Sequence, residues 1–289
     1  MGEALAVAKS ESVQVEGLNI RFQRAGSGPA MVLVHGLLAH SFSWRFALPL
    51  LAREREVFAL DMAGCGFSDV DPGLDCTLAG AANRLVRFMD AVEIRSCELI
   101  GSSYGGATSL MLATQQPQRL RSLTLVSPAN PWSRIGRKRL ALLNVSALGS
   151  LFPAFARSIH PVTGYFLRRM YGDPRKVTRE TVEGYTRPLR RPGVLEHGVK
   201  IAQAWRKSMD ELEQALPAAV GVPTLLIWGS KDRLVDRASA EILKQRLHAK
   251  LTIMHGAGHL PYEECPEEFC GIVQRFLAEH PERPVLDGK

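Results

Sequence analysis

Short apolar runs alternate with helical patterns along most of this chain. Uninterrupted apolar runs of this kind are typical of strands buried on both faces of a sheet. Alternation of such strands with helices predicts an α/β fold, in which a mostly parallel sheet is covered on both faces. The predicted strands lie at residues 30–34, 57–60, 97–100, 123–126, 224–228 and 251–254, and the predicted helices at 77–92, 104–116, 238–247 and 266–277. Residues 12–24 predict two further short strands, with a turn at Glu16-Gly17.

The alternation stops between residues 130 and 220. This stretch contains seven prolines and no convincing strand run, but it has several short amphipathic helical patterns. We interpret it as a helical insertion that leaves the carboxyl edge of the sheet. The expected organisation is a core of residues 1–129 and 220–289, with the insertion at residues 130–219.

The charge of the chain is uneven. The 289 residues carry a formal charge of +7, but residues 131–210 alone carry +11, so the remainder is mildly acidic. Such a field attracts anionic groups, which favours a small-molecule substrate bearing carboxylate or phosphate, or peripheral contact of the insertion with an anionic membrane surface. Basic runs at residues 137–139 and 168–169 lack a nucleic-acid motif and interleaved aromatic residues, so no nucleic-acid partner is expected. The oligomeric state cannot be read from these patterns.

The cysteines and the N-terminal segment point to an intracellular protein. The five cysteines form no C-x-x-C pair and lack metal-ligand spacing, so we expect free thiols, no metal and no organic cofactor. Residues 1–15 have no apolar core before a cleavage site, and the chain has no run of about 18 apolar residues that could span a membrane. The predicted location is cytoplasmic.

The most informative motif is Gly101-Ser102-Ser103-Tyr104-Gly105. It matches G-x-S-x-G, and it lies directly after a predicted strand and before a predicted helix, as a nucleophile elbow requires. The turn would strain the backbone of Ser103 and present its hydroxyl at the helix N-terminus, with glycines two residues to either side to avoid clashes. Ser103 is therefore the candidate nucleophile.

A serine hydroxyl needs a base, and the base needs a carboxylate that orients it. Asp232 follows the predicted strand at 224–228, and His259 follows the strand at 251–254. Each of the three candidates thus lies just beyond the carboxyl end of a strand, where open α/β sheets bind ligands. Asp236 is a weaker alternative acid. His255 is a weaker alternative base, for which we expect a structural or partly buried role.

Two backbone amides are candidates for an oxyanion hole. The first is the N–H of Tyr104, which begins the helix after the elbow. The second is the N–H of Leu37, in the His35-Gly36-Leu37 loop after the strand at 30–34.

Together, these motifs resemble the α/β-hydrolase superfamily, and in particular its small, cap-bearing serine hydrolases. The resemblance rests on five motifs in the same chain order: His35-Gly36, Asp61 to Ser68, Gly101 to Gly105, Gly229 to Asp232, and Gly258-His259. It implies an eight-stranded, mostly parallel sheet with a helical cap, and catalysis by Ser103, Asp232 and His259. The expected enzyme is a carboxylesterase or lipase-like hydrolase of small to medium apolar esters.

Departures from related subfamilies leave alternatives open. Epoxide hydrolases and haloalkane dehalogenases of this superfamily carry aspartate at the elbow, so Ser103 disfavours both chemistries. Carbon–carbon hydrolases of ring-cleavage products typically carry Asn before the nucleophile and Trp after the histidine, where this chain has Ser102 and Leu260. Carbon–carbon hydrolysis of a vinylogous diketone, a perhydrolase side activity and a hydrolase-fold signal receptor with slow turnover all stay open.

Several other residues have structural interpretations. We expect the His35 ring to organise its loop through nearby backbone, Asp61 to organise its turn, and His40 to lie either at the pocket mouth or in a solvated loop. Cys65 and Cys97 are expected to be packing residues. Aromatic residues of the insertion are expected mainly to pack its helices together: Trp132, Phe152, Phe155, Tyr165 and Phe166.

Overall fold

The computed structural model describes residues 7–133, 160–219 and 221–280, and its centre is one eight-stranded sheet. The strand order is β1-β2-β4-β3-β5-β6-β7-β8. Pairs β1/β2 and β2/β4 are antiparallel, and all other pairs are parallel. The strands are β1 (Lys9–Val15), β2 (Leu18–Ala25), β3 (Ala30–Val34), β4 (Glu56–Leu60), β5 (Cys97–Ser102), β6 (Leu120–Val126), β7 (Thr224–Gly229) and β8 (Lys250–Met254).

The predicted α/β sheet is confirmed. Every predicted apolar run is a strand, and the bounds differ by at most three residues at either end. All six residues of β5 and of β7 are buried, because helices cover both faces of these central strands. The predicted turn at Glu16-Gly17 joins β1 to β2, and both of its residues have positive φ.

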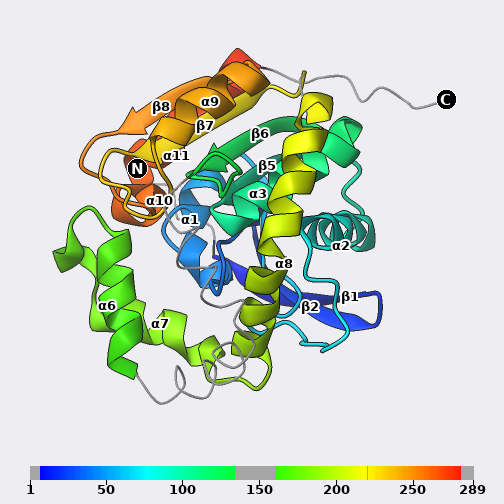
Figure 1. Ribbon diagram of the computed structural model, residues 1–289, viewed down its shortest axis with the longest axis vertical. Coiled ribbons are helices and arrows are strands. Elements are labelled where there is room, and N and C mark those ends of the chain that lie inside the picture. The colour runs from blue at the N-terminus through cyan, green and yellow to red at the C-terminus, as the bar shows by residue number, and fades with distance from the viewer. Residues whose placement is uncertain (1–6, 134–159, 220, 281–289) are drawn as a thin grey trace.

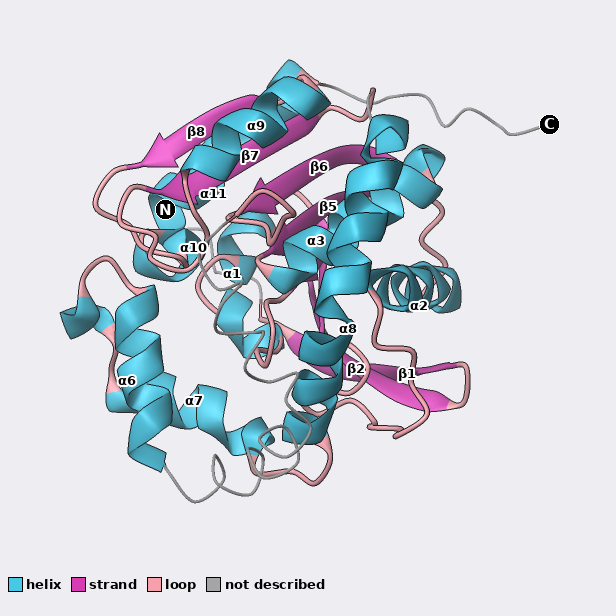
Figure 2. Cartoon of the chain, viewed as in Figure 1, coloured by secondary structure: helices cyan, strands magenta, loops and turns pink. Residues whose placement is uncertain are grey.

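Helices form a layer on each face of the sheet (Figure 2). One apolar cluster packs α2 (Leu78–Ala91), α3 (Tyr104–Gln115) and α9 (Ala238–Leu247) against the sheet, and a second packs α1 (Leu48–Leu51) and α11 (Pro266–Glu279) on the other face. Short elements complete the core: η1 (Ser41–Trp44), η2 (Pro117–Arg119) and α10 (Pro261–Glu264). The Thr77 hydroxyl caps α2 by accepting from the Gly80 amide at 3.1 Å, as its sequence position predicts.

Between β6 and β7 the chain forms helices and leaves the sheet, on the side toward which the parallel strands point (Figure 1). These are α6 (His160–Met170), η3 (Pro174–Lys176), α7 (Arg179–Leu189), α8 (Val194–Ala215) and η4 (Leu216–Ala219). We call residues 160–219 the helical insertion. The boundaries of the cap at 130 and 219 stay a prediction, since residues 134–159 lie outside the described part.

The sequence predicts several short helical patterns in this region, but α8 is longer than that and has 22 residues. Residues 193–216 contain no proline, and Pro192 and Pro217 flank them. The helix can therefore continue until Pro217, and it buries an apolar stripe against the core. None of the helices in the described ranges is long and apolar enough to cross a membrane.

Candidate active site

The chain turns sharply between β5 and α3, and Ser103 lies at the turn. Ser103 has φ 53° and ψ −115°, a left-handed conformation that strains a residue with a Cβ. A Cβ at Gly105 would clash with the carbonyl oxygens of Val34 and His35, and a Cβ at Gly101 would clash with Gly105 and Ser109. The prediction that these glycines avoid clashes around a strained serine is confirmed.

The loop after β3 passes directly beside Ser103. A Cβ at Gly36 would lie 3.3 Å from Ser103 Cβ and 3.9 Å from Ser103 Oγ. Leu37 is the next residue in this loop. Tyr104 is the first residue of α3, so its N–H has no acceptor within the helix. The amides of Leu37 and Tyr104 stay the proposed oxyanion donors.

His259 and Asp232 form a buried pair. His259 Nδ1 lies 2.9 Å from Asp232 Oδ2, and the side chains are 3% and 0% exposed. Asp232 Oδ1 also accepts from the amides of Leu234 (2.8 Å) and Val235 (3.1 Å). Burial acts to raise the pKa of Asp232, but the His259 ring and the Leu234 amide outweigh it, so the pKa lies below its ordinary value. The carboxylate is thus kept ionised beside the imidazole.

Ser103 follows β5 and His259 follows β8. A side-chain hydrogen bond joins residues close to each of them. The Tyr262 hydroxyl donates to Ser102 Oγ at 3.2 Å, which ties the segment after His259 to the elbow. Among the described residues, no hydrogen bond joins Ser103 Oγ to the His259 ring. Proton transfer between them therefore belongs to the proposed mechanism.

The alternative acid and base have other surroundings. Asp236 Oδ1 accepts from the Ala238 amide at 3.0 Å, at the start of α9. His255 is exposed, so the expectation of a partly buried role is wrong. His255 directly follows the edge strand β8, and the chain turns at Gly256, which has φ +83°.

His35 and Asp61 have the structural roles predicted for them. His35 Nδ1 lies 2.8 Å from the Gly36 carbonyl oxygen, and His35 Nε2 accepts from the Met62 amide at 3.0 Å. Burial lowers the pKa of His35 to about 4. Asp61 accepts from the amides of Ser41 (2.7 Å) and Phe67 (2.8 Å), and so organises its turn.

The solvated position considered for His40 is wrong. His40 is buried, and its Nε2 lies 3.0 Å from the carbonyl oxygen of Gly184 in α7. Its ring stacks on Phe42, and a Cβ at Gly184 would clash with that Phe42 ring. The insertion therefore packs directly on the loop after Leu37, which buries His40.

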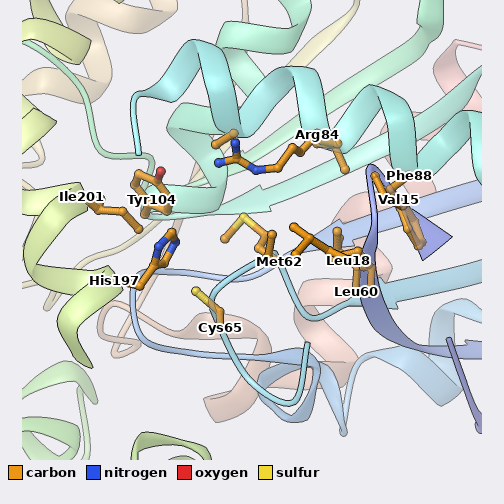
Figure 3. Close-up of a pocket in the computed structure, with 14 residues that line it drawn as sticks. Val15, Leu18, Leu60, Met62, Cys65, Arg84, Phe88, Tyr104, His197 and Ile201 are labelled. Carbon is orange, nitrogen blue, oxygen red and sulfur yellow. The ribbon is translucent and has the colours of Figure 1, made fainter. Parts of the chain in front are cut away.

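A cavity of about 30 Å³ lies behind the elbow and does not include Ser103 (Figure 3). Tyr104 and His197 lie at one end of this cavity, and Val15 and Phe88 lie at the other. Its volume fits about one water molecule. The thiol of Cys65 also lines it, and burial raises the pKa of that thiol to about 12, which fits a packing residue.

The aromatic residues predicted to pack the insertion have different environments. Tyr165 and Phe166 of α6 are 58% and 48% exposed and contact each other edge to face, so the packing prediction is wrong for both. Their helix buries Leu167 instead, and the two aromatic side chains face outward. Trp132 is partly buried against the core. Phe152, Phe155 and the basic run at 137–139 lie outside the described residues.

The predictions of free thiols and of a packing role for Cys97 are confirmed. All five cysteines are unpaired thiols, and Cys97 is fully buried with a pKa raised to about 12 by burial.

Two residues that the sequence reading missed lie beside the site. Glu263 and Glu264 of α10 are buried, and their carboxylates receive hydrogen bonds from the insertion and from the His259 loop. The available signal is a pair of consecutive glutamates four and five residues after the candidate base.

Known proteins resemble this chain over most of its length. A pimeloyl-[acyl-carrier protein] methyl ester esterase of Aeromonas hydrophila is 26% identical, covering 90% of this chain and all of the relative. A 2-hydroxymuconate semialdehyde hydrolase of a Pseudomonas species is 28% identical, covering 91% of this chain and 92% of the relative. The solved structure of Cfl2 from Burkholderia cenocepacia has a TM-score of 0.83 at 21% identity, covering 92% of this chain and 95% of that one.

The family model described as the alpha/beta hydrolase fold matches residues 29–266, a range that contains the elbow, Asp232 and His259. This match, the eight-stranded sheet order and the strained serine after β5 agree with one another. The chain belongs to the alpha/beta hydrolase family.

Proposed function

We propose that this protein hydrolyses carboxylic esters of small to medium, apolar substrates through an acyl-enzyme. Ser103 is the nucleophile, His259 is the base and then the acid, and Asp232 orients His259. The observation that carries the proposal is the buried His259–Asp232 pair, which follows β7 and β8 while a strained serine follows β5. These are the groups that acyl transfer requires, and the strained turn exposes the serine for attack.

The mechanism has two halves. His259 Nε2 takes the Ser103 proton as Oγ bonds to the ester carbonyl carbon, and the amides of Leu37 and Tyr104 stabilise the oxyanion. The oxyanion collapses, the carbon–oxygen bond to the leaving group breaks, and His259 gives its proton to the departing alcohol oxygen. Water then attacks the acyl carbon, His259 takes its proton and returns it to Ser103, and the acid leaves. The ionised Asp232 stabilises the imidazolium in both halves.

The similarity to the methyl ester esterase supports ester hydrolysis. The similarity to the 2-hydroxymuconate semialdehyde hydrolase favours a second candidate function, carbon–carbon bond hydrolysis on the same triad. Ser102 weighs against that second candidate in this chain, because carbon–carbon hydrolases of ring-cleavage products typically carry Asn at this position.

A substrate panel separates the two candidates. p-Nitrophenyl esters of increasing acyl length and ring-cleavage diketones should be tested with the wild-type protein and Ser103→Ala. We expect ester turnover that depends on acyl length and on Ser103. Faster turnover of diketones than of every ester would favour the second candidate. Ligand-induced stabilisation with turnover far below about 1 per second would favour a receptor instead.

A further inference from the structure

We propose that Glu264 is a positioning residue for His259, and that it couples the orientation of the base to the docking of the helical insertion. This inference rests on the proposed role of His259 as the base. It concerns a residue outside the triad, in α10, whose carboxylate lies between the insertion and the loop that carries His259.

Glu264 bridges two separate segments of backbone. Its Oε1 accepts from the Gly258 amide at 2.6 Å, directly before His259. Its Oε2 accepts from the amides of Gly172 (2.8 Å) and Asp173 (3.2 Å), which follow α6 in the insertion. Glu264 is 6% exposed, so its carboxylate, and not water, is the acceptor for these amides. All three amides depend on this one side chain; the Gly258 amide is buried and those of Gly172 and Asp173 are partly buried. A buried amide that loses its acceptor is costly.

The same two segments also bind each other directly. The His259 amide donates to the Met170 carbonyl oxygen at 2.6 Å, at the end of α6. A Cβ at Gly258 would clash with Met170 and Gly172, and a Cβ at Gly172 would clash with the Gly256 carbonyl. The backbones therefore touch without side chains between them, and a shift of one segment must move the other.

The hydrogen bond from the His259 amide to Met170 lies on the peptide that sets the direction of the His259 side chain. One ring nitrogen is held by Asp232. The other can reach Ser103 only if the backbone at residues 258–259 keeps its orientation, and Glu264 holds the Gly258 amide there. Reacting groups displaced by about 1 Å can lose about 100-fold in rate, so a small rotation of this peptide is enough to matter.

The neighbouring Glu263 supplies a matched control. Its carboxylate also binds the insertion, since it accepts from the hydroxyls of Tyr171 (2.6 Å) and Tyr185. It pairs with Arg45 at 2.7 Å, and it is as deeply buried as Glu264. No hydrogen bond in the described part of the chain joins Glu263 to the loop of residues 255–259. Glu263→Gln therefore weakens other contacts between α10 and the insertion, while the hydrogen bonds of Glu264 to Gly258, Gly172 and Asp173 stay in place.

The test compares covalent labelling of Ser103 by a fluorophosphonate in the full-length wild type, Glu264→Gln and Glu263→Gln. Saturation kinetics separate the affinity for the probe from the rate constant of the covalent step. A glutamine offers one acceptor oxygen, so it cannot serve Gly258 and the insertion together. We expect the covalent rate constant of Glu264→Gln to fall by about tenfold or more at unchanged probe affinity. Glu263→Gln should stay within about twofold of the wild type, even where its thermal midpoint falls further.

Equal rate constants in the wild type and Glu264→Gln, or equal losses in both variants, would overturn the positioning role. Failure of the proposed function looks different, because the wild type would then show no labelling that depends on Ser103.

Amide hydrogen exchange of the wild type provides a measurement that needs no variant to fold. We expect one common protection factor for four amides, because a single opening event should expose all of them: those of Gly172, Asp173, Gly258 and His259. Exchange at Gly258 and His259 that is about tenfold faster than at Gly172 would contradict the coupling.

Discussion

His259 Nδ1 and Asp232 Oδ2 lie 2.9 Å apart in a site that excludes water from both side chains. The bond fixes which imidazole nitrogen faces away from the carboxylate, and hence which one can accept a proton from a nucleophile. The ionised state of Asp232 is maintained by two backbone amides as well as by the histidine. The pair is thus organised before any substrate binds.

Asp232→Asn should reduce ester turnover by about 10³-fold to 10⁴-fold, because the amide favours the wrong imidazole tautomer while it keeps the shape of the site. Initial rates with a p-nitrophenyl ester measure the effect. Asp236→Asn is the matched control, because Asp236 accepts from the Ala238 amide at the start of α9 and has no contact with His259 among the described residues. This variant should keep turnover within about twofold of the wild type. A larger loss in Asp236→Asn than in Asp232→Asn would reverse the assignment of the acid.

The sheet and the elbow could be predicted from the sequence, because both depend on local patterns. Residues 30–34 form a strand with the same bounds as the apolar run, and four of its five residues are buried. At Gly101 and Gly105 an added Cβ would clash with neighbouring atoms, as the motif predicts. The environments of His40 and of Glu264 could not be predicted in this way. Their burial depends on contacts with Gly184 and Gly172, which are more than 90 residues away along the chain and belong to the insertion.

Gly105→Ala should destabilise the protein by about 1–3 kcal/mol and slow labelling of Ser103, because a Cβ there would clash with the carbonyls of Val34 and His35. Chemical unfolding and fluorophosphonate labelling measure the two effects. Gly271→Ala in α11 is the control, since its Cβ would lie at an ordinary 3.4 Å from Arg275 Nη1. It should stabilise the helix by about 0.5–1 kcal/mol. Wild-type stability and labelling in Gly105→Ala would show that the elbow does not need this close approach.

Stability should fall with acidification partly through His197, which lies on α8 against Gly64. Burial, with help from Arg84 and Lys200, lowers the pKa of His197 from 6.5 to about 4. Between these two values the unfolded chain binds a proton that the folded chain does not, so stability decreases as the pH falls through this window. The loss attributable to this residue approaches about 3 kcal/mol.

Unfolding free energies of the wild type and His197→Gln at pH 7, 6, 5 and 4 measure this contribution. The variant should show a shallower fall, and the remaining slope should include His35, whose pKa is also lowered to about 4. His255→Gln, in an exposed loop, serves as the matched control. Parallel curves for the wild type and His197→Gln would rule out the contribution of His197.

The basic charge of the insertion gives a prediction about substrate choice. Replacing Arg168, Arg169 and Arg179 with glutamate should lower kcat/KM for anionic esters several-fold more than for neutral esters, because the charge of residues 131–210 falls from +11 to +5. The difference should shrink as salt is added. Equal effects on both ester classes would mean that this charge does not select the substrate.

Ser103 is the proposed nucleophile of this hydrolase. The most direct measurement is intact-mass and peptide mass spectrometry after reaction with a fluorophosphonate, on the wild type and on Ser103→Ala. We expect one adduct per wild-type chain, located on Ser103, and neither an adduct nor ester turnover in Ser103→Ala. An unmodified Ser103, with full ester turnover retained in Ser103→Ala, would contradict it.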